Sequence, residues 1–358
     1  MTTKRIAGLR EKLQELGVDA ILVTHAVNRR YISGFTGSSG VLLVTQSDSW
    51  LLTDFRYMTQ APQQAVDFTV VEHAARWIDT VKELAASAGV KKLAFEQEQV
   101  VFSEYTAWTA ALGDGIQLVP VSSVIEGLRM FKDEAELAIM RDACKLADDT
   151  FQHMLGFIKP GLREREVALE MEIFMRSKGA ASSSFDTIVA SGERSALPHG
   201  VASERVIGNN EYVKLDFGAY YNGYCSDLTR TIVVGQPTDR HREIYEIVLE
   251  AQLAAIAAIK PGMTGKEADA IARDIITRHG YGDRFGHGTG HGLGMEIHEA
   301  PRLSVTGTTV LEPGMTVTVE PGIYIPGFGG VRIEDDIVIT ASGNSLLTSS
   351  PKTLFILE

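Results

Sequence analysis

Ile158-Lys159-Pro160-Gly161 recurs in this chain as Ile259-Lys260-Pro261-Gly262, at an offset of 101 residues. Each copy follows one long helical pattern, opens another, and leads into strand-rich sequence. The alternative is two unrelated turns, because Pro-Gly is a common connection between helices. The recurrence of both the phrase and its surroundings favours an internal duplication, in which two halves face each other across a site. Two further pairs keep the same offset, Glu166 with Glu267 and Gly179 with Gly280.

The composition of the chain limits the kind of protein that it can be. The chain has 358 residues, 44% hydrophobic and 22% charged, which is an ordinary globular balance for about two domains. The net charge of −12 disfavours nucleic acid and anionic membranes as partners. Cys144 and Cys225 are the only cysteines and form no disulfide framework, as in a reducing cytosol. The charged N-terminal segment is no signal peptide, and no run reaches the about 18 apolar residues of a membrane span, so we expect a cytoplasmic protein.

The first third alternates helical and strand patterns. This alternation predicts a smaller α/β domain with a mixed sheet over residues 1–130. A long helical pattern with the acidic start Asp133-Glu134-Ala135-Glu136 opens a second domain over residues 131–358. The expected helices are 4–16 and 75–88, and the expected strands are 19–24, 40–45, 50–53 and 92–95.

Five residues of the second domain have the composition of a two-metal hydrolytic site. Carboxylates with one imidazole suit Mn²⁺, Co²⁺ or Zn²⁺. Two such ions can bridge one water, deprotonate it near neutral pH and stabilise a tetrahedral intermediate. The five residues are Asp216, Asp227, His291, Glu320 and Glu334.

The two aspartates lie in apolar, β-branched runs that predict a hairpin, residues 213–219 and 225–234. A turn at Tyr221-Asn222 places the aspartates directly opposite each other, whereas a turn at Asn222-Gly223 makes them diagonal neighbours on one face. Either register brings like charges together, and a metal ion removes that penalty. The alternative of two solvated turn residues conflicts with the apolar surroundings.

The second cluster is the glycine-rich stretch Gly286–Gly294, which contains His287 and His291. Glycine at alternate positions lets the backbone approach a ligand closely, although a flexible loop is the alternative. The neighbouring Glu296-Ile297-His298-Glu299 favours a site. It is not the zincin motif HExxH, because Arg302 stands where the second histidine is needed.

The third pair of acidic residues lies in the apolar runs 316–320 and 331–339, which predict two strands joined by a Pro/Gly-rich loop. Glu320 and Glu334 are costly to bury there unless they are paired or coordinate a metal. Arg332 shares the strand face of Glu334 and would orient it, or it forms a surface ion pair.

Two residues remain ambiguous from their local sequence. His199, in Leu197-Pro198-His199-Gly200, taken alone is more typical of a loop than of a catalytic group. Cys225 shares a strand face with Asp227 and would approach the metals, but a small buried residue explains it equally well.

Residues 140–358 resemble the proline-specific metallopeptidases of the pita-bread fold, the aminopeptidase P and prolidase group. The resemblance implies an α+β chain: a pita-bread (creatinase/aminopeptidase) domain with pseudo-two-fold duplication, preceded by a creatinase-like α/β domain. Segments 33–40 and 53–57 look more like aminopeptidase P than like dipeptidases. The matching stretches of the second domain are 190–200, 215–218, 226–231, 288–292, 297–299, 319–322 and 331–335.

The resemblance implies a role for each ligand candidate. Asp216 would ligate one metal, Asp227 and Glu334 would bridge both, and His291 with Glu320 would complete the other. Mn²⁺ is the expected ion, and Co²⁺ and Zn²⁺ accept the same ligands. Glu320 would also act as general base toward the bridging water that attacks the scissile carbonyl.

The resemblance also implies groups that contact the substrate. His298 and His199 would hydrogen-bond the scissile carbonyl or the tetrahedral intermediate. Arg332 would support the metal ligands, and His287 would line the site.

The expected function is hydrolysis of the Xaa-Pro bond at the N-terminus of short peptides, by a homodimeric Xaa-Pro aminopeptidase. The alternative is an Xaa-Pro dipeptidase (prolidase), in which an arginine caps the free proline carboxylate. More remote alternatives are a methionine aminopeptidase and a non-catalytic pita-bread module that binds partners.

Overall fold

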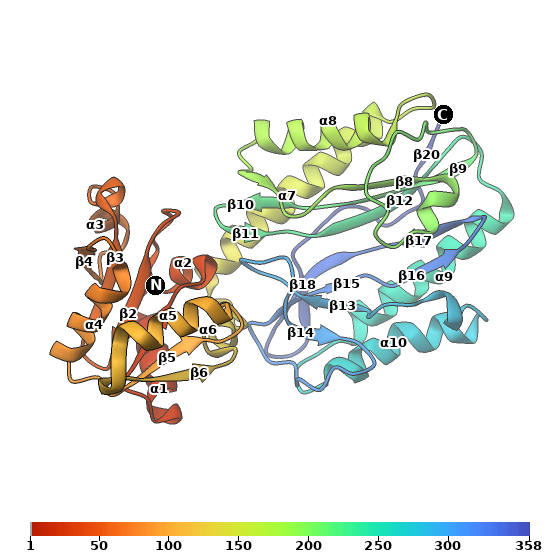
Figure 1. The fold of residues 1–358 in the computed structure, drawn as a ribbon. Coiled ribbons are helices and arrows are strands. Elements are labelled where there is room, and N and C mark those ends of the chain that lie inside the picture. Colours follow the sequence, from red (N-terminus) through yellow and green to blue (C-terminus); the bar gives the residue numbers. More distant parts are fainter. Residues whose placement is uncertain (1) are drawn as a thin grey trace. The chain divides into compact units, whose positions relative to one another are not determined.

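The computed structural model describes residues 2–358, and the chain falls into two compact units, Met1–Arg129 and Met130–Glu358 (Figure 1). The first unit is an α/β domain, as the alternating patterns predict. Its helices are α1 (Thr2–Leu16), α2 (Ala26–Ser33), α3 (Ala61–Gln64), α4 (Trp77–Ser87), α5 (Phe102–Leu112) and α6 (Val124–Arg129), with 3₁₀ turns η1 (Phe55–Tyr57) and η2 (Gly113–Gly115). Its strands are β1 (Ala20–Val23), β2 (Val41–Thr45), β3 (Ser49–Thr53), β4 (Thr69–Glu72), β5 (Lys92–Glu96) and β6 (Gln117–Val121).

The sheet of the first unit is mixed, in the order β4-β3-β2-β1-β5-β6. The pairs β1–β2 and β2–β3 are antiparallel, and the pairs β1–β5, β5–β6 and β3–β4 are parallel. Strand β1 is fully buried because helices cover the sheet, which explains its continuous apolar run. Leu22, Leu43, Leu93 and Trp108 belong to its hydrophobic core.

The second unit contains two helix pairs and strands that form two larger and two smaller sheets. The helices are α7 (Glu134–Phe157), α8 (Glu164–Ser177), α9 (Asp239–Ala258) and α10 (Gly265–Arg278), with 3₁₀ turns η3 (Gly192–Ala196) and η4 (Gly282–Arg284). The first-half strands are β7 (Ser182–Ser183), β8 (Ile188–Ser191), β9 (Glu211–Phe217), β10 (Ala219–Tyr221), β11 (Tyr224–Cys225) and β12 (Leu228–Val234). The remaining strands are β13 (Gly290–Gly292), β14 (Glu299–Leu303), β15 (Thr316–Val319), β16 (Gly322–Ile325), β17 (Gly329–Arg332), β18 (Asp335–Ile339), β19 (Asn344–Leu346) and β20 (Ile356–Leu357).

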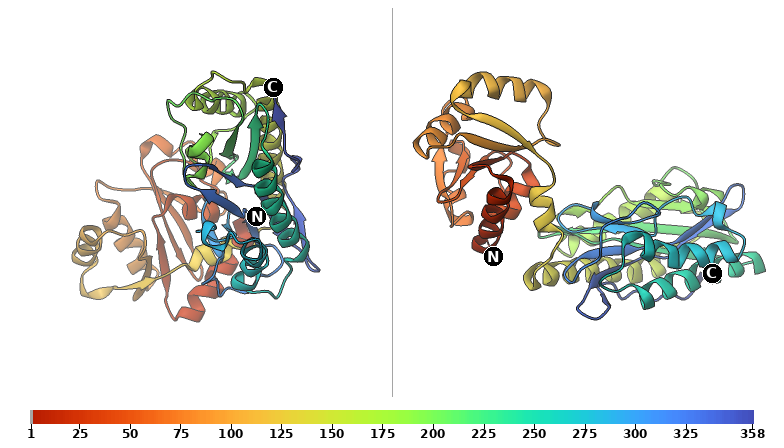
Figure 2. Two further views of the ribbon diagram at one scale, coloured as in Figure 1. Left: turned by 90° about the vertical axis from the view of Figure 1, so that its right-hand side faces the viewer. Right: turned by 90° about the horizontal axis from the view of Figure 1, so that it is seen from below.

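The helix pairs lie outside the sheets, α7 and α8 on one half and α9 and α10 on the other (Figures 1 and 2). One larger sheet has the order β20-β12-β9-β8 and the other β14-β13-β15-β18-β19. Each half has its own hydrophobic core: Phe151 and Val213 belong to one, and Val248 and Val317 to the other. The two halves of the second unit are thus packed around separate cores.

The internal duplication is confirmed. In both copies the repeated phrase connects two helices, and its glycine has a positive φ, 93° at Gly161 and 89° at Gly262. Glu166 and Glu267 occupy the same capping position, where each carboxylate accepts the backbone N–H at the start of the second helix. Helix α7 begins with the same capping arrangement: the Asp133 carboxylate accepts the N–H of Glu136, and the Glu136 carboxylate accepts the N–H of Asp133.

The hairpin has the second of the two expected registers. Tyr221 pairs with Tyr224, so Asn222 and Gly223 form the turn, with positive φ at both. Asp216 is therefore opposite Thr229 in the antiparallel ladder. Asp227 lies just before β12 and is the diagonal neighbour of Asp216.

The single strand expected over 331–339 is wrong. The chain forms β17 and β18 instead, and Glu334 lies at the break between them. Strand β17 pairs with β16, whereas β18 pairs with β15 and β19. The chain thus changes sheets here, and the freed N–H of Glu334 donates to the carbonyl oxygen of Thr229 at 3.1 Å. The break turns the Glu334 carboxylate toward the facing half.

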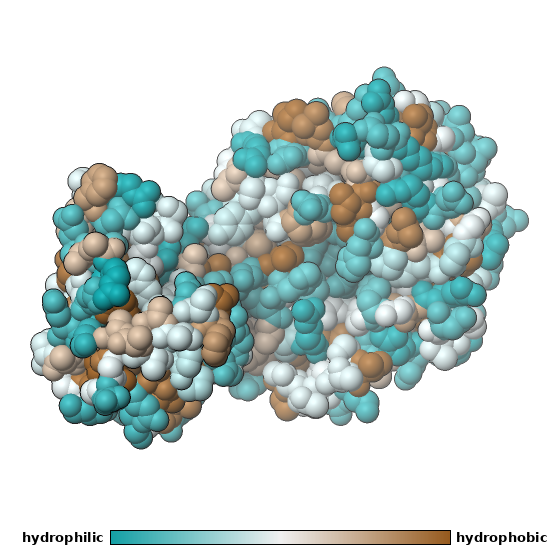
Figure 3. Space-filling model, in the orientation of Figure 1, coloured by the Kyte–Doolittle hydropathy of each residue, from teal (hydrophilic) through white to brown (hydrophobic). Residues whose placement is uncertain are grey.

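No helix within residues 2–358 has the length and apolar character that crossing a membrane requires. Figure 3 shows one face of the molecule, on which hydrophilic side chains are interspersed with isolated hydrophobic ones.

Candidate active site

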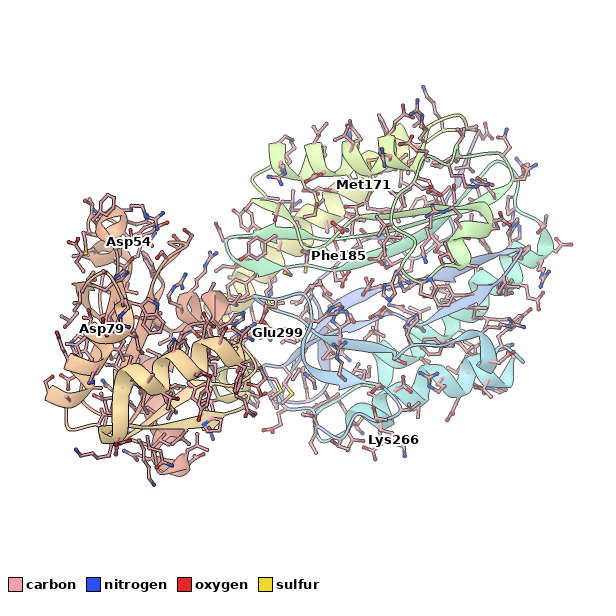
Figure 4. The ribbon with its side chains drawn as sticks, in the orientation of Figure 1. Asp54, Asp79, Met171, Phe185, Lys266 and Glu299 are labelled. Atoms are coloured by element: carbon pink, nitrogen blue, oxygen red, sulfur yellow. The ribbon has the colours of Figure 1, made fainter. Side chains whose placement is uncertain are left out.

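A cavity of about 570 Å³ opens between the two halves of the second unit. Figure 4 marks Phe185, which follows β7 on one half, and Glu299, which begins β14 on the other. The residues of the first half that line the cavity are Phe185, Asp186, Ile188, Pro198, His199, Val201, Asp216 and Asp227. The second half contributes His287, Gly288, Gly290, His291, Ile297, His298, Arg302, Ser304, Glu320, Arg332 and Glu334. All of the sequence-derived site residues therefore face one cavity.

The ligand candidates converge on one point of the cavity wall. Asp227, His291 and Glu334 each offer a ligand atom, and these atoms all lie within 4.8 Å of one another. His291 Nε2 is 3.6 Å from Asp227 Oδ2 and 3.5 Å from Glu320 Oε1. Asp216, on the facing strand β9, is buried and accepts a hydrogen bond from Arg332.

The protonation of His291 fits a cation at this point. Its Nδ1 lies 3.0 Å from the carbonyl oxygen of Gly292, which can only accept, so Nδ1 carries the proton. Burial lowers the pKa of the imidazole to about 3, and the ring is neutral at pH 7. The Nε2 lone pair therefore faces the carboxylates of Asp227 and Glu320, an arrangement of acceptors that a divalent ion satisfies.

The buried carboxylates also indicate a metal site. Burial, followed by repulsion from the neighbouring acidic groups, raises the pKa of Asp227 and of Glu334 well above the usual range. Oδ1 of Asp227 is buried and has no hydrogen-bond partner among the described residues. Buried carboxylates coordinate metals or pair with cations. The residues of the site therefore fit divalent metal ions.

Glu320 differs from the other acidic residues. Burial raises its pKa to about 7, against the opposing effect of Arg332 and with a further contribution from Asp216. Its Oε1 accepts a hydrogen bond of 3.2 Å from the Thr318 hydroxyl. A carboxyl group that titrates near neutral pH can both accept and return a proton, as a general base that later serves as an acid must.

Arg332 is buried, so its expected alternative as a surface ion pair is wrong. In addition to its bond to Asp216, Nη1 donates to the Tyr324 hydroxyl at 2.7 Å. Nε donates to the Thr229 hydroxyl at 3.1 Å, and that hydroxyl donates to Glu334 Oε2 at 2.5 Å. One guanidinium thus orients carboxylates from both halves.

The three other histidines that line the cavity differ in whether their ring nitrogens already have hydrogen-bond partners. His298 and His199 are exposed at the cavity, with the His298 ring 4.5 Å from that of His291. Burial, followed by Arg302 and His199, lowers the pKa of His298. His287 uses both ring nitrogens: Nδ1 is 2.8 Å from the carbonyl oxygen of Gly288, and Nε2 is 2.7 Å from the Tyr324 hydroxyl. His287 therefore supports Tyr324 while its ring lines the cavity.

Sequence reasoning missed two parts of the site. Tyr324 links His287 to Arg332, and the only signal for it is its place in a strand beside the cavity. Arg302 appeared only as the residue that rules out HExxH, yet its side chain lines the cavity. Cys225 is buried with its sulfur 3.9 Å from the carbonyl oxygen of Met295, and burial raises the pKa of the thiol to about 12. It is a small buried residue outside the cavity.

Comparison with known proteins gives two family matches. The family described as "Metallopeptidase family M24" matches residues 138–341, and "Creatinase/Prolidase N-terminal domain" matches residues 5–131. The solved structure of an Xaa-Pro dipeptidase from Bacillus anthracis is similar at 54% identity and a TM-score of 0.98, with 100% of each chain covered. An Xaa-Pro dipeptidase of Pyrococcus furiosus is 41% identical over 98% of this chain and 99% of its own. An X-Pro aminopeptidase structure from Thermotoga maritima is 39% identical, with a TM-score of 0.92, over 97% of this chain and 100% of its own.

Proposed function

This chain belongs to metallopeptidase family M24, and from that premise we propose that it is an Xaa-Pro dipeptidase. It hydrolyses the bond between the first residue and the proline of a dipeptide. The dipeptidases among its relatives favour this alternative over the Xaa-Pro aminopeptidase that the N-terminal motifs suggest. Family membership and the convergent acidic residues argue against a module that only binds partners.

The observation that carries the dipeptidase proposal is Arg302. Its guanidinium is exposed at the cavity and forms no ion pair with a carboxylate among residues 2–358. Arg332, in contrast, is buried and occupied by Asp216 and Tyr324. A free guanidinium matches the planar carboxylate of a C-terminal proline. A longer peptide has an amide at that point, so the cation favours dipeptides.

The proposed metal ligands are the five residues expected from the sequence. Two divalent ions, Mn²⁺ by preference, would be held by Asp216, Asp227, His291, Glu320 and Glu334. When bound, such ions supply Lewis acidity toward the scissile carbonyl and lower the pKa of water. Arg332 and Thr229 keep the carboxylates of both halves in place through their hydrogen bonds.

Glu320 is the proton carrier of the proposed reaction. Its carboxylate accepts the proton of the attacking water. The same group then returns the proton to the proline nitrogen as the carbon–nitrogen bond breaks, since a tertiary amide nitrogen leaves only when protonated.

His298 and His199 are the proposed donors to the carbonyl oxygen. Both rings are exposed at the cavity, and hydrogen bonds from them gain strength as negative charge develops on that oxygen. His287 and Arg332 act indirectly, because Tyr324 and Asp216 already use their donors and acceptors.

The test is metal-dependent release of alanine from Ala-Pro and from Ala-Pro-Ala by the Mn²⁺-loaded protein, with a chelated control. Cleavage of Ala-Pro with little cleavage of Ala-Pro-Ala supports the dipeptidase. Cleavage of both peptides supports the second candidate, an Xaa-Pro aminopeptidase, which the similarity to the Thermotoga maritima structure favours. Release from neither peptide contradicts both candidates.

Glu320→Gln is the matched variant for this experiment, because it keeps the shape of the side chain and removes its proton-accepting capacity. We expect it to lose about 10²-fold or more in kcat. A variant that retains wild-type turnover would exclude Glu320 as the general base.

A further inference from the structure

The turn that carries His199 is held by two buried basic side chains, Lys214 and Arg332. Leu197-Pro198-His199-Gly200 is a tight turn, closed by the N–H of Gly200, which donates to the carbonyl oxygen of Leu197 at 3.3 Å. Nζ of Lys214 donates to the same Leu197 oxygen at 2.6 Å and lies 3.3 Å from that of Pro198. Nη1 of Arg332 donates to the Pro198 oxygen at 3.1 Å. The backbone on the N-terminal side of His199 is thus fixed by both side chains.

Lys214 ties this turn to the metal-ligand face. It lies on β9 two residues before Asp216, and side chains alternate along a strand, so both point to the same face. Its Nζ is also 5.0 Å from the centre of the Tyr324 ring. Strand β9 therefore positions a ligand carboxylate and the His199 turn together.

Burial of Lys214 at this position is energetically unfavourable. Lys214 is completely buried and forms no ion pair with a carboxylate within residues 2–358. Burying a lysine amine without a carboxylate partner costs stability. The hydrogen bonds of its amine go to the backbone of one turn, at Leu197 and Pro198. We infer that holding this turn is the role of Lys214.

We propose that Lys214 is a positioning residue for His199. By holding the turn, Lys214 keeps the His199 imidazole at the distance from the metal ligands that a hydrogen bond to the reacting carbonyl oxygen requires. The proposal rests on the proposed role of His199 as a donor to that oxygen. Lys214 does not line the cavity and touches no substrate. Because a small displacement of a donor has a large effect on the transition state, a looser turn lowers kcat more than it raises KM.

The experiment is a double-mutant cycle with Lys214→Met, His199→Ala and the double variant. Methionine keeps most of the buried volume and removes the donor. We expect Lys214→Met to lower kcat about tenfold with little change in KM, as weakening one oxyanion donor does. The double variant should match His199→Ala, because the two effects pass through one residue. Lys145→Met is the control, since Lys145 forms an exposed ion pair with Asp149 at 2.6 Å and neither residue lines the cavity; it should retain wild-type kcat.

A second readout needs no substrate. Hydrogen exchange in the metal-free protein should show faster exchange of the Gly200 amide in Lys214→Met than in the wild type, with the α7 amides unchanged. If the wild type cleaves no Xaa-Pro peptide, the proposed function fails, while exchange still reports whether Lys214 holds the turn.

Three results would overturn the proposal. One is additivity of the two substitutions in kcat, and another is unchanged exchange at Gly200. The third is that the protein cannot fold without Lys214. Lys214→Gln tests this, because glutamine keeps a buried hydrogen-bond donor; we expect it to fold and to show a kcat between those of the wild type and Lys214→Met. If neither Lys214→Met nor Lys214→Gln folds, Lys214 is a requirement of folding and has no separate positioning role.

Discussion

Nε2 of His291 lies 3.5 Å from Oε1 of Glu320, and both atoms can ligate a metal ion. The proton of the neutral imidazole is on Nδ1, toward the Gly292 carbonyl. Asp227 Oδ2 lies at nearly the same distance from Nε2, 3.6 Å. This arrangement is unfavourable unless a metal ion or a proton lies between the atoms, and it links metal binding to the stability of the second unit.

Metal removal should therefore destabilise the protein. We expect a chelator to lower Tm, and Mn²⁺ to restore it, with about 2.7 kcal/mol of stabilisation at a hundredfold excess over Kd. Differential scanning calorimetry measures both states. His291→Ala should abolish most of the Mn²⁺-dependent increase. A Tm that does not respond to chelation or to Mn²⁺ would show that the site binds no ion.

The metal-free protein should show a pH dependence that Glu320 governs in part. The pKa of Glu320 is raised from 4.5 to about 7, so the folded state holds a proton that the unfolded state releases. Its contribution to stability is fully present below pH 4.5 and is lost as the pH rises to about 7. His291 works in the opposite direction, since its pKa is lowered from 6.5 to about 3 and its contribution is lost as the pH falls.

The variant Glu320→Gln separates the contribution of Glu320 to the pH dependence of stability from that of His291. In chelator, the difference in unfolding free energy between Glu320→Gln and wild type should move in favour of the variant between pH 4.5 and 7, by at most about 3 kcal/mol. Urea unfolding at several pH values measures it. A difference that is constant with pH would mean that Glu320 has its ordinary pKa in the folded protein.

Arg302 should decide which peptides are cleaved. Arg302→Met should lower kcat/KM for Ala-Pro about 10- to 100-fold, the effect of losing a hydrogen bond between charged groups. Any cleavage of Ala-Pro-Ala should change little, because that peptide offers no carboxylate there. Arg165→Met is the matched control, an exposed arginine that pairs with Glu204 outside this cavity. Equal losses for both peptides would assign Arg302 a role other than carboxylate recognition.

Arg332 should be essential to the stability of the metal-free site. Arg332→Met leaves the buried Asp216 carboxylate without its partner, which costs about 3–5 kcal/mol. Arg332→Lys should recover only part of that, because an ammonium cannot reproduce the contacts to Asp216, Tyr324 and Thr229 together. Urea unfolding in chelator and in Mn²⁺ should give the larger loss in chelator. A loss of under about 0.5 kcal/mol, typical of surface substitutions, would contradict this account.

Local sequence was enough for the elements that have a strong period. The repeat at 158 and 259 predicted the two-fold arrangement, because each copy encodes a helix end and a helix start within a few residues. The hairpin followed from β-branched runs around Asn222-Gly223, and the side-chain period of two brought Asp216 and Asp227 to one face. Acidic residues within apolar strands marked the site, because burial there is costly without a cation.

The tertiary structure decided what depends on contacts between distant segments. The strand break at Glu334 arises because β17 and β18 join different sheets, and no local pattern specifies the partner of a strand. Lys214 reaches the turn at Leu197, and Arg332 reaches Asp216, across gaps of 17 and 116 residues. The sequence by itself thus determined the duplicated fold and the acidic residues of the centre. Only the tertiary structure showed that Arg332 pairs with Asp216, that Arg302 faces the cavity, and that Lys214 bonds to the turn at Leu197. The reason is that the energy of a buried polar group depends on its three-dimensional partners.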